Sequence, residues 1–195
     1  MPIKLNSTGG GSVTIDVPNM STANTLTLPA ITGNVITSAD SATIRQSMMG
    51  SGIAGNGPAF SVSRTTSNQS VTSSTWSRIN FNAEEFDTAN CFDSTTNYRF
   101  TPNVAGYYLF TISAGCTVSS TVSGIALGKN GGIFKYLTIS YISTSPNNVM
   151  NGSVLCYLNG STDYADAYFY SNGTSPTIYA DQTQTHFTGF LARAA

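Results

Sequence analysis

Residues 100–113 read FTPNVAGYYLFTIS, the clearest strand pattern in the chain. Its second half is a run of aromatic and β-branched residues, which favour extended strands. Side chains alternate between the two faces of a strand, so Tyr108, Phe110 and Ile112 share one apolar face. The pattern predicts a strand over 107–113 that packs one face into a core.

Short stretches of the same kind recur from Pro58 to the end of the chain. They are separated by polar turns rich in Gly, Asn, Ser and Thr. The nine strands that we predict lie at 59–63, 76–81, 107–113, 124–129, 133–142, 153–158, 164–170, 177–180 and 186–191. Nine strands at this spacing predict an all-β sandwich.

The strand at 164–170 is the other place where the alternation is clear. Ala165, Ala167 and Phe169 share one face, opposite a row of phenols. That row consists of Tyr164, Tyr168 and Tyr170, together with Asp166. Tyr combines apolar area with a hydrogen-bonding tip, so an outward row of it predicts contact with another subunit or a ligand. His186, the single histidine, is predicted to be buried or to face a neighbouring subunit.

The charge composition narrows the classes of partner. Charged residues make up 9% of the chain, with eight Lys and Arg against nine Asp and Glu. Nucleic acid binding needs clustered cations, so we expect no nucleic acid partner. No run approaches the roughly 20 apolar residues of a membrane helix, so we expect no membrane insertion. A surface with so few charges is typical of a subunit that buries area against copies of itself.

The three cysteines are odd in number, so at least one of them has no disulfide partner within the chain. They are Cys91, Cys116 and Cys156, and their spacing is not that of a metal site. We predict buried thiols that behave as small apolar side chains.

Residues 1–38 are predicted to form a separate unit with short strands at 13–17, 26–28 and 35–36. This unit has too few apolar side chains to bury a core alone, so we expect it to interleave with neighbouring chains or to dock on a larger partner as an attachment segment. The sequence of 12–38 is similar to short β-modules in tail-fibre proteins of bacteriophages, especially those of cyanobacteria. Residues 39–57 are predicted to be a linker, in which a short helix and a solvated turn both stay open.

The segment 58–195 resembles the globular head of the complement C1q/tumour necrosis factor superfamily. The likeness lies in ordered strings: AFSV at 59–62, INFNAEEFDTANCFDSTTNYRFTPNVAGYYLF at 79–110, LGKNGG at 127–132, LNGSTDYADAYFY at 158–170 and THFTGFL at 185–191. The resemblance implies a C1q/TNF-like jelly-roll β-sandwich of two sheets that assembles as a homotrimer. It also implies a protein that binds other molecules and is not an enzyme.

The titratable residues do not form a recognisable catalytic set. A hydrolase built on Ser, His and Asp would have to use His186, which lies within an aromatic strand. Asp163 and Asp166 are three positions apart, which places them on opposite faces of a strand. We therefore predict that these carboxylates do not converge as a glycosidase pair within one subunit.

The acidic residues near position 90 are the candidates for a metal site. We interpret Glu84, Glu85 and Asp87 as solvated residues of one loop. Some heads of the resembled superfamily bind calcium near the trimer axis, and calcium needs oxygen ligands. The resemblance makes Asp87 and Asp93 the candidate calcium ligands, and we expect no other cofactor.

These features together predict a bacteriophage virion protein, assembled in the host cytoplasm. Residues 1–38 attach a trimeric fibre-type subunit to another virion protein, and the head binds a host receptor such as a surface glycan. Three weak contacts on one trimer add avidity. The receptor loops are expected at 143–152 and 171–177, which are rich in Asn and Ser. Two alternatives stay open, a capsid decoration protein and, third, a bacterial surface adhesion module.

Overall fold

A computed structural model of the protein describes residues 3–6, 8–9, 12–15, 57–118, 122–141 and 145–195. The chain divides into two units, Met1–Ala39 and Asp40–Ala195. Every regular element within the described residues is a β-strand. No helix in this part of the chain has the length and apolar character needed to cross a membrane.

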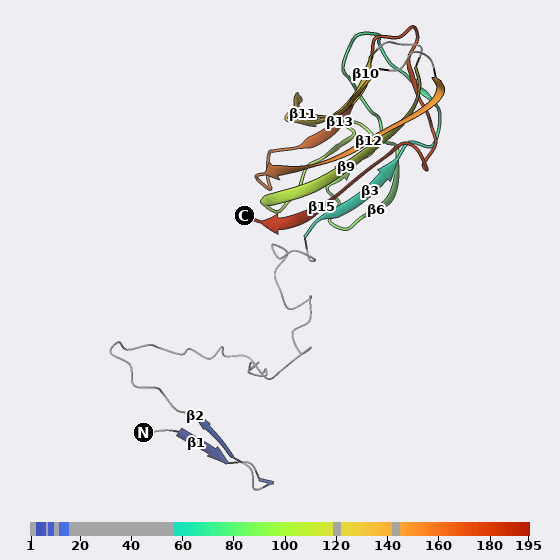
Figure 1. The fold of residues 1–195 in the computed structure, drawn as a ribbon. Coiled ribbons are helices and arrows are strands. Elements are labelled where there is room, and N and C mark those ends of the chain that lie inside the picture. Colours follow the sequence, from blue (N-terminus) through green and yellow to red (C-terminus); the bar gives the residue numbers. More distant parts are fainter. Residues whose placement is uncertain (1–2, 7, 10–11, 16–56, 119–121, 142–144) are drawn as a thin grey trace. The chain divides into compact units, whose positions relative to one another are not determined.

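The first unit contains a β-hairpin (Figure 1). Strand β1 (Ile3–Asn6) pairs antiparallel with β2 (Ser12–Ile15). Strand β2 overlaps the predicted strand at 13–17, whereas β1 was not predicted. The strands predicted at 26–28 and 35–36 lie outside the described residues, as does the linker up to residue 56.

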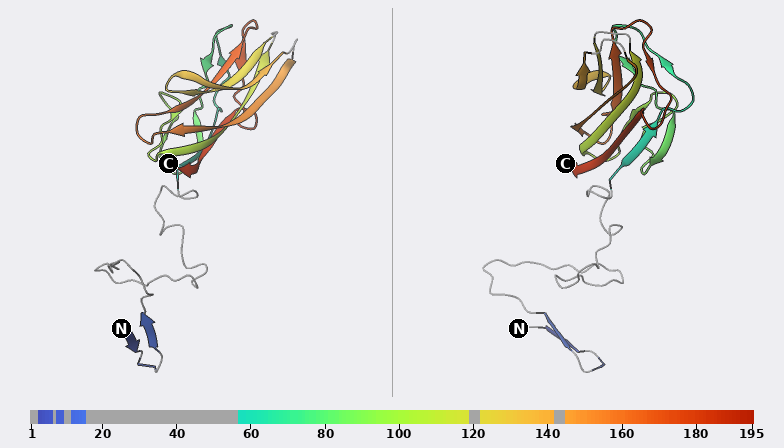
Figure 2. Two further views of the ribbon diagram at one scale, coloured as in Figure 1. Left: turned by 60° about the vertical axis from the view of Figure 1, so that its left-hand side comes forward. Right: turned by 45° about the vertical axis from the view of Figure 1, so that its right-hand side comes forward.

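The second unit is a sandwich of two antiparallel sheets, seen from two further sides in Figure 2. The first sheet, called the β9 sheet, contains β3 (Ala59–Ser63), β4 (Gln69–Ser70), β6 (Ala83–Asp87), β9 (Gly106–Val118), β12 (Ser145–Leu158), β14 (Thr177–Ile178) and β15 (His186–Ala194). The second, called the β13 sheet, contains β5 (Ser77–Arg78), β7 (Phe92–Asp93), β8 (Arg99–Phe100), β10 (Ser123–Lys129), β11 (Gly132–Ser140) and β13 (Ala165–Ser171). This arrangement confirms the predicted all-β jelly roll.

Strand β9 is the centre of its sheet. It pairs along its length with β12 on one side, and with β15 and then β14 on the other. Beyond β15 follow β3 and the edge strand β6. In the other sheet β10 lies between β11 and β13. Strands distant in sequence are therefore neighbours, which is why the jelly roll needs the whole segment to form.

The core between the sheets is mainly aromatic. Tyr108, Phe110 and Ile112 are fully buried, as their alternation predicts. The ring of Phe60 on β3 lies 4.6 Å from that of Phe100 and 4.9 Å from that of Phe187, measured between centroids. The sandwich is thus held together by apolar burial and by stacked and edge-on ring contacts.

Gly189 allows these rings to cross the sheet. A Cβ at this position of β15 would lie 2.6 Å from a ring carbon of Phe110 and 2.7 Å from one of Phe60. Both contacts are shorter than carbon atoms tolerate. The space that a side chain would take is filled by the two aromatic rings, so the glycine is required by packing.

Two sequence-based expectations about loops are wrong. Glu84, Glu85 and Asp87 lie on strand β6, which pairs with β3 at the edge of the β9 sheet. The part of the 143–152 loop from residue 145 onward belongs to the long strand β12. Both strands lie at an edge with one face open to solvent, where polar residues are accommodated although they have low strand propensity.

The three thiols are free and buried, as predicted. Burial raises the pKa of Cys116 to about 12. It also raises the pKa of Cys91 and Cys156. All three thiols are therefore protonated at neutral pH and chemically quiet.

Candidate functional site

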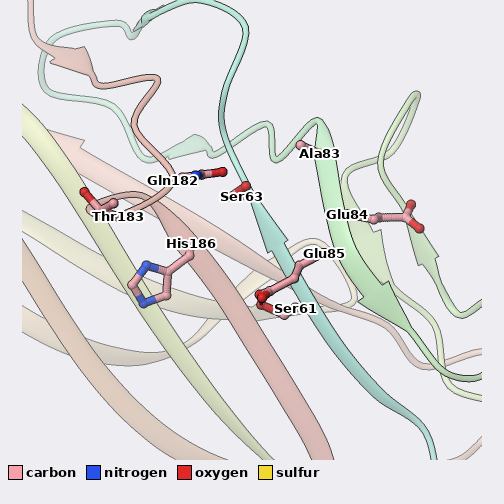
Figure 3. Close-up of a pocket in the computed structure, with 8 residues that line it drawn as sticks. All are labelled: Ser61, Ser63, Ala83, Glu84, Glu85, Gln182, Thr183 and His186. Carbon is pink, nitrogen blue, oxygen red and sulfur yellow. The ribbon is translucent and has the colours of Figure 1, made fainter.

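A cavity of about 540 Å³ opens on the outer face of the β9 sheet (Figure 3). It lies where β3, β6 and β15 run side by side. Its lining residues are Ser61, Ser63, Ala83, Glu84, Glu85, Gln182, Thr183 and His186. The cavity is polar, and its lining includes the single histidine and two acidic residues that lie about a hundred positions earlier in the sequence.

Both acidic side chains that line this cavity accept hydrogen bonds from serine hydroxyl groups. Ser61 Oγ donates a hydrogen bond of 2.9 Å to Glu85 Oε2. Glu84 points away from the histidine in Figure 3 and accepts a 2.6 Å hydrogen bond from Ser94 Oγ. His186 is half-buried on β15, opposite Ser63 of β3. The Ser61 hydroxyl therefore bonds to a carboxylate and not to an imidazole base, which is not the arrangement that nucleophilic catalysis requires.

The row of phenols lies on the outer face of the β13 sheet, and each ring contacts a side chain of the same subunit. The guanidinium carbon of Arg99 lies 4.1 Å from the ring centroid of Tyr164. The Tyr168 hydroxyl donates a 3.1 Å hydrogen bond to Asp166 Oδ2. The ring of Tyr170 packs at 5.4 Å against a tryptophan. Whether the row also contacts a neighbouring subunit stays a prediction.

Asp166 is buried, although its place in the row of phenols predicts an exposed side chain. Its side chain is 0% exposed and forms a 2.9 Å ion pair with Nε of Arg78. Burial raises the pKa of the Asp166 carboxyl, and Arg78 opposes that rise. Asp163 instead forms an ion pair with Lys129, so the two carboxylates have separate partners.

The two candidate calcium ligands accept hydrogen bonds from their own turns. Asp87 accepts the backbone N–H groups of Ala89 and Phe92. Asp93 accepts those of Thr95, Thr96 and Asn97, and these bonds hold the pKa of its carboxyl well below the usual range. Within the described residues no three His, Cys, Asp or Glu side chains gather as a metal site. Calcium binding by this pair stays a prediction.

The predicted receptor loop at 171–177 is largely a loop in the structure. Strand β13 ends at Ser171 and β14 begins at Thr177. The side-chain oxygen of Asn172 accepts a 2.9 Å hydrogen bond from the backbone of Val122, which ties this loop to the start of β10. Its role in receptor binding stays a prediction.

A surface that sequence reasoning missed lies on the outer face of β9, β12 and β15. Tyr107, Leu155, Tyr157 and Phe190 are large apolar side chains, each at least 41% exposed. We call these four residues the apolar face. The rings of Tyr107 and Tyr157 are 5.4 Å apart, and a second cavity of about 480 Å³ is lined by Tyr107, Leu155 and the C-terminal residues. The available signal in the sequence was the period of two that places Ser153, Leu155 and Tyr157 on one face of a strand.

Comparisons with known proteins agree with this architecture. Residues 59–192 match the family model of the C1q domain. A comparison with curated protein sequences found no match. The solved globular domain of zebrafish complement 1qA is similar, with 20% identity and a TM-score of 0.54, over 71% of this chain and 100% of that one. Murine APRIL at pH 8.5 is similar in fold, with 10% identity and a TM-score of 0.51, over 69% of this chain and 98% of its own. Since the family match spans most of the sequence, the chain belongs to the C1q domain family.

Proposed function

We propose that this protein is a homotrimeric recognition subunit of a bacteriophage virion. Its C1q-type head assembles in threes and presents its remaining surface to a receptor on the host. The observation that carries the trimer is the apolar face. Monomers rarely leave a contiguous apolar patch of this kind in water, whereas a subunit interface buries one.

The trimer is tested by placing charge on the apolar face. The full chain should have a mass of about three times 20.5 kDa by light scattering. The double variant Leu155→Glu with Tyr157→Glu should fall to a single subunit mass, because two carboxylates cannot be buried there without partners. The matched control, Leu155→Met with Tyr157→Phe, keeps the apolar area and should stay trimeric. A wild-type monomer at micromolar concentration contradicts the proposal.

The virion role is supported by the N-terminal unit and by composition. Residues 12–38 resemble β-modules of phage tail fibres, and a weakly charged trimer suits a receptor that is a host surface glycan. Repetition of one weak site on three subunits raises the affinity for a repetitive surface. Residues 1–38 attach the trimer to another virion protein in this proposal.

Microscopy of intact particles with a label on the head tests that role. Label at the tail supports a fibre-type receptor-binding protein. Label on the shell indicates a capsid decoration protein instead, and particles without label contradict any virion role. Binding of the full-length trimer to host cells, lost after enzymatic removal of surface glycans, supports the receptor class.

A further inference from the structure

Three aromatic rings form a contact cluster on the outer face of the β13 sheet. The ring of Trp76 stacks on that of Tyr136, with centroids 5.2 Å apart and planes 14° apart. Its other neighbour is Tyr170, at 5.4 Å and 39°. Tyr136 comes from β11, Tyr170 from β13, and Trp76 from the turn just before β5. We call these three residues the aromatic platform.

The strand between β11 and β13 carries a glycine beside the indole. Gly124 of β10 pairs with Ile139 on one side and with Tyr170 on the other. A Cβ on this glycine would lie 3.4 Å from Cη2 of Trp76 and 2.5 Å from Cδ1 of Ile139. A Cβ at this position would be in ordinary contact with the indole and would clash with Ile139, so the missing side chain lets Ile139 of β11 lie close to β10 beside Trp76.

The platform lies outside the core and is accessible. Tyr136 is 62% exposed, and Trp76 and Tyr170 are half-buried. The inward residues of β13, Ala167 and Phe169, point into the core on the opposite side of the strand. The platform is therefore on the other sheet from the apolar face.

A polar group adjoins the platform along β13. Tyr168 lies two residues from Tyr170, on the same side of the strand. The side chain of Arg78 is 33% exposed, and it donates a 3.1 Å hydrogen bond to the backbone oxygen of Asn97. Its charge is compensated by the buried carboxylate of Asp166 at 2.9 Å. This border offers hydrogen-bond donors and phenol oxygens around the Arg78–Asp166 ion pair.

We propose that the aromatic platform is a binding site for a pyranose ring of a neutral glycan, a proposal that rests on the proposed recognition function. The C–H groups on one face of a sugar ring carry a slight positive charge and stack on the negative faces of aromatic rings. The sugar hydroxyls exchange hydrogen bonds with the neighbouring phenols and Arg78. An anionic ligand is disfavoured, because Asp166 already neutralises the nearest cation.

The chain carries its own reporter for this site. Trp76 is the only tryptophan in the sequence, so intrinsic tryptophan fluorescence reports on the platform alone. The full-length protein is titrated with the methyl glycosides of glucose, galactose, mannose and N-acetylglucosamine. We expect a saturable change in fluorescence with at least one of them, at dissociation constants of about millimolar for a single ring.

Two exposed tyrosines give a matched pair of variants. Tyr136→Ala removes one ring of the platform and should weaken the binding of the active glycoside at least about tenfold. Tyr141→Ala, which removes an 81% exposed ring that has no described ring contact, should leave it unchanged. Because both side chains are exposed, both variants should fold, and unchanged mass and circular dichroism verify this.

The outcomes separate this site from the proposed function. No saturable change with any of the four glycosides overturns the site, and so does equal affinity in wild type and Tyr136→Ala. If that variant still binds host cells fully, the head recognises its receptor elsewhere and only the platform assignment fails. Binding that survives removal of the host glycans and is lost in Tyr136→Ala indicates a protein ligand, which also overturns the glycan assignment. A monomeric protein that binds no host cells contradicts the proposed function independently of the sugar titration.

Discussion

Gly189 shows how strongly one residue constrains this core. Its place is filled by the rings of Phe60 and Phe110, so any side chain there displaces one of them. A core at crystal-like packing density has no room to absorb such a shift freely.

We expect Gly189→Ala to lower the free energy of unfolding by about 1–3 kcal/mol, the usual effect of overpacking. Urea denaturation measures this change. Gly132→Ala is the control, because a Cβ there meets only the carbonyl oxygen of Lys129 at 3.9 Å and should change stability little. Equal stability of wild type and Gly189→Ala contradicts the packing argument.

The hydrogen bonds to the Asp93 carboxylate predict that the stability of the fold depends on pH. Backbone N–H groups of Thr96 and Thr95 bond to its ionised form and lower its pKa from the ordinary value of 3.8. An acid whose pKa is lowered by folding stabilises the fold above its unfolded pKa, and this contribution is lost as the pH falls below it.

Asp93→Ala should therefore lower the free energy of unfolding by about 1 kcal/mol at neutral pH, the size of a lost cap. The difference from wild type should shrink as the pH falls below 3.8. Thermal unfolding across that pH range tests this. A difference that is the same at every pH indicates that the charge of Asp93 does not contribute.

At the scale of residues, the sequence predicts which side chains of a strand face the core, because side chains alternate between its two faces. The inward set of Tyr108, Phe110 and Ile112 follows from period two alone. The burial of Asp166 does not, because its partner Arg78 is 88 positions away and reaches it only through the pairing of β5 with β13. Trp76 was predicted as part of a strand, and its contact with Tyr136 depends on a third strand, β10.

At the scale of elements, the β10–β11 hairpin has a turn whose two residues suit its backbone conformation. Asn130 and Gly131 have φ values of 54° and 82°, the left-handed pair that two-residue hairpins favour. The Asn130 side chain also donates to Asp163 Oδ1 and accepts from the backbone N–H of Tyr164. The turn thus joins the hairpin to the start of β13.

Two substitutions separate these contributions. Asn130→Ala loses both the side-chain bonds and the tolerance of positive φ, and it should destabilise the fold by about 2–3 kcal/mol. Asn130→Gly keeps the backbone conformation and should cost about half of that. Urea denaturation of both variants is the measurement, and equal losses contradict a role for the left-handed backbone.

Strands β6 and β12 show what element prediction from sequence misses. The residues AEEFD of β6 have low strand propensity, and they form a strand because β3 offers an unpaired edge. Asn148 and Asn151 of β12 pair with β9. The β9–β12 ladder is the longest in the described part of the molecule. Pairing across the fold, and not local preference, decides both elements.

At the scale of the whole molecule, the ordered strings of sequence were sufficient to predict the sandwich. Each string is short, yet the ordered set indicates the C1q/TNF-like fold, and residues 59–192 match the C1q domain accordingly. The candidate surfaces were harder to predict. The apolar face combines residues of β9, β12 and β15, and the polar cavity combines β3, β6 and β15, so both need the strand order before they can be recognised.

The buried thiols make the unfolding of the head directly measurable. Cys91, Cys116 and Cys156 lie in different strands or turns and are at most 8% exposed. In the native protein a thiol-specific alkylating reagent should therefore react slowly, and in denaturant it should react at three sites. Mass spectrometry of the labelled protein counts the modified sites. Fast labelling of the native protein contradicts the described burial.

The labelling rates of the same three thiols also report on three separate parts of one domain. When the closed state returns faster than the reagent reacts, the labelling rate at each cysteine measures the population of the open state at that position. If all three positions react together, the sandwich opens as one cooperative unit. If Cys91 reacts first, the β7 side of the molecule opens while the long β9–β12 ladder, which holds Cys116 and Cys156, remains closed. The chain thus reports the order in which it comes apart without any added probe.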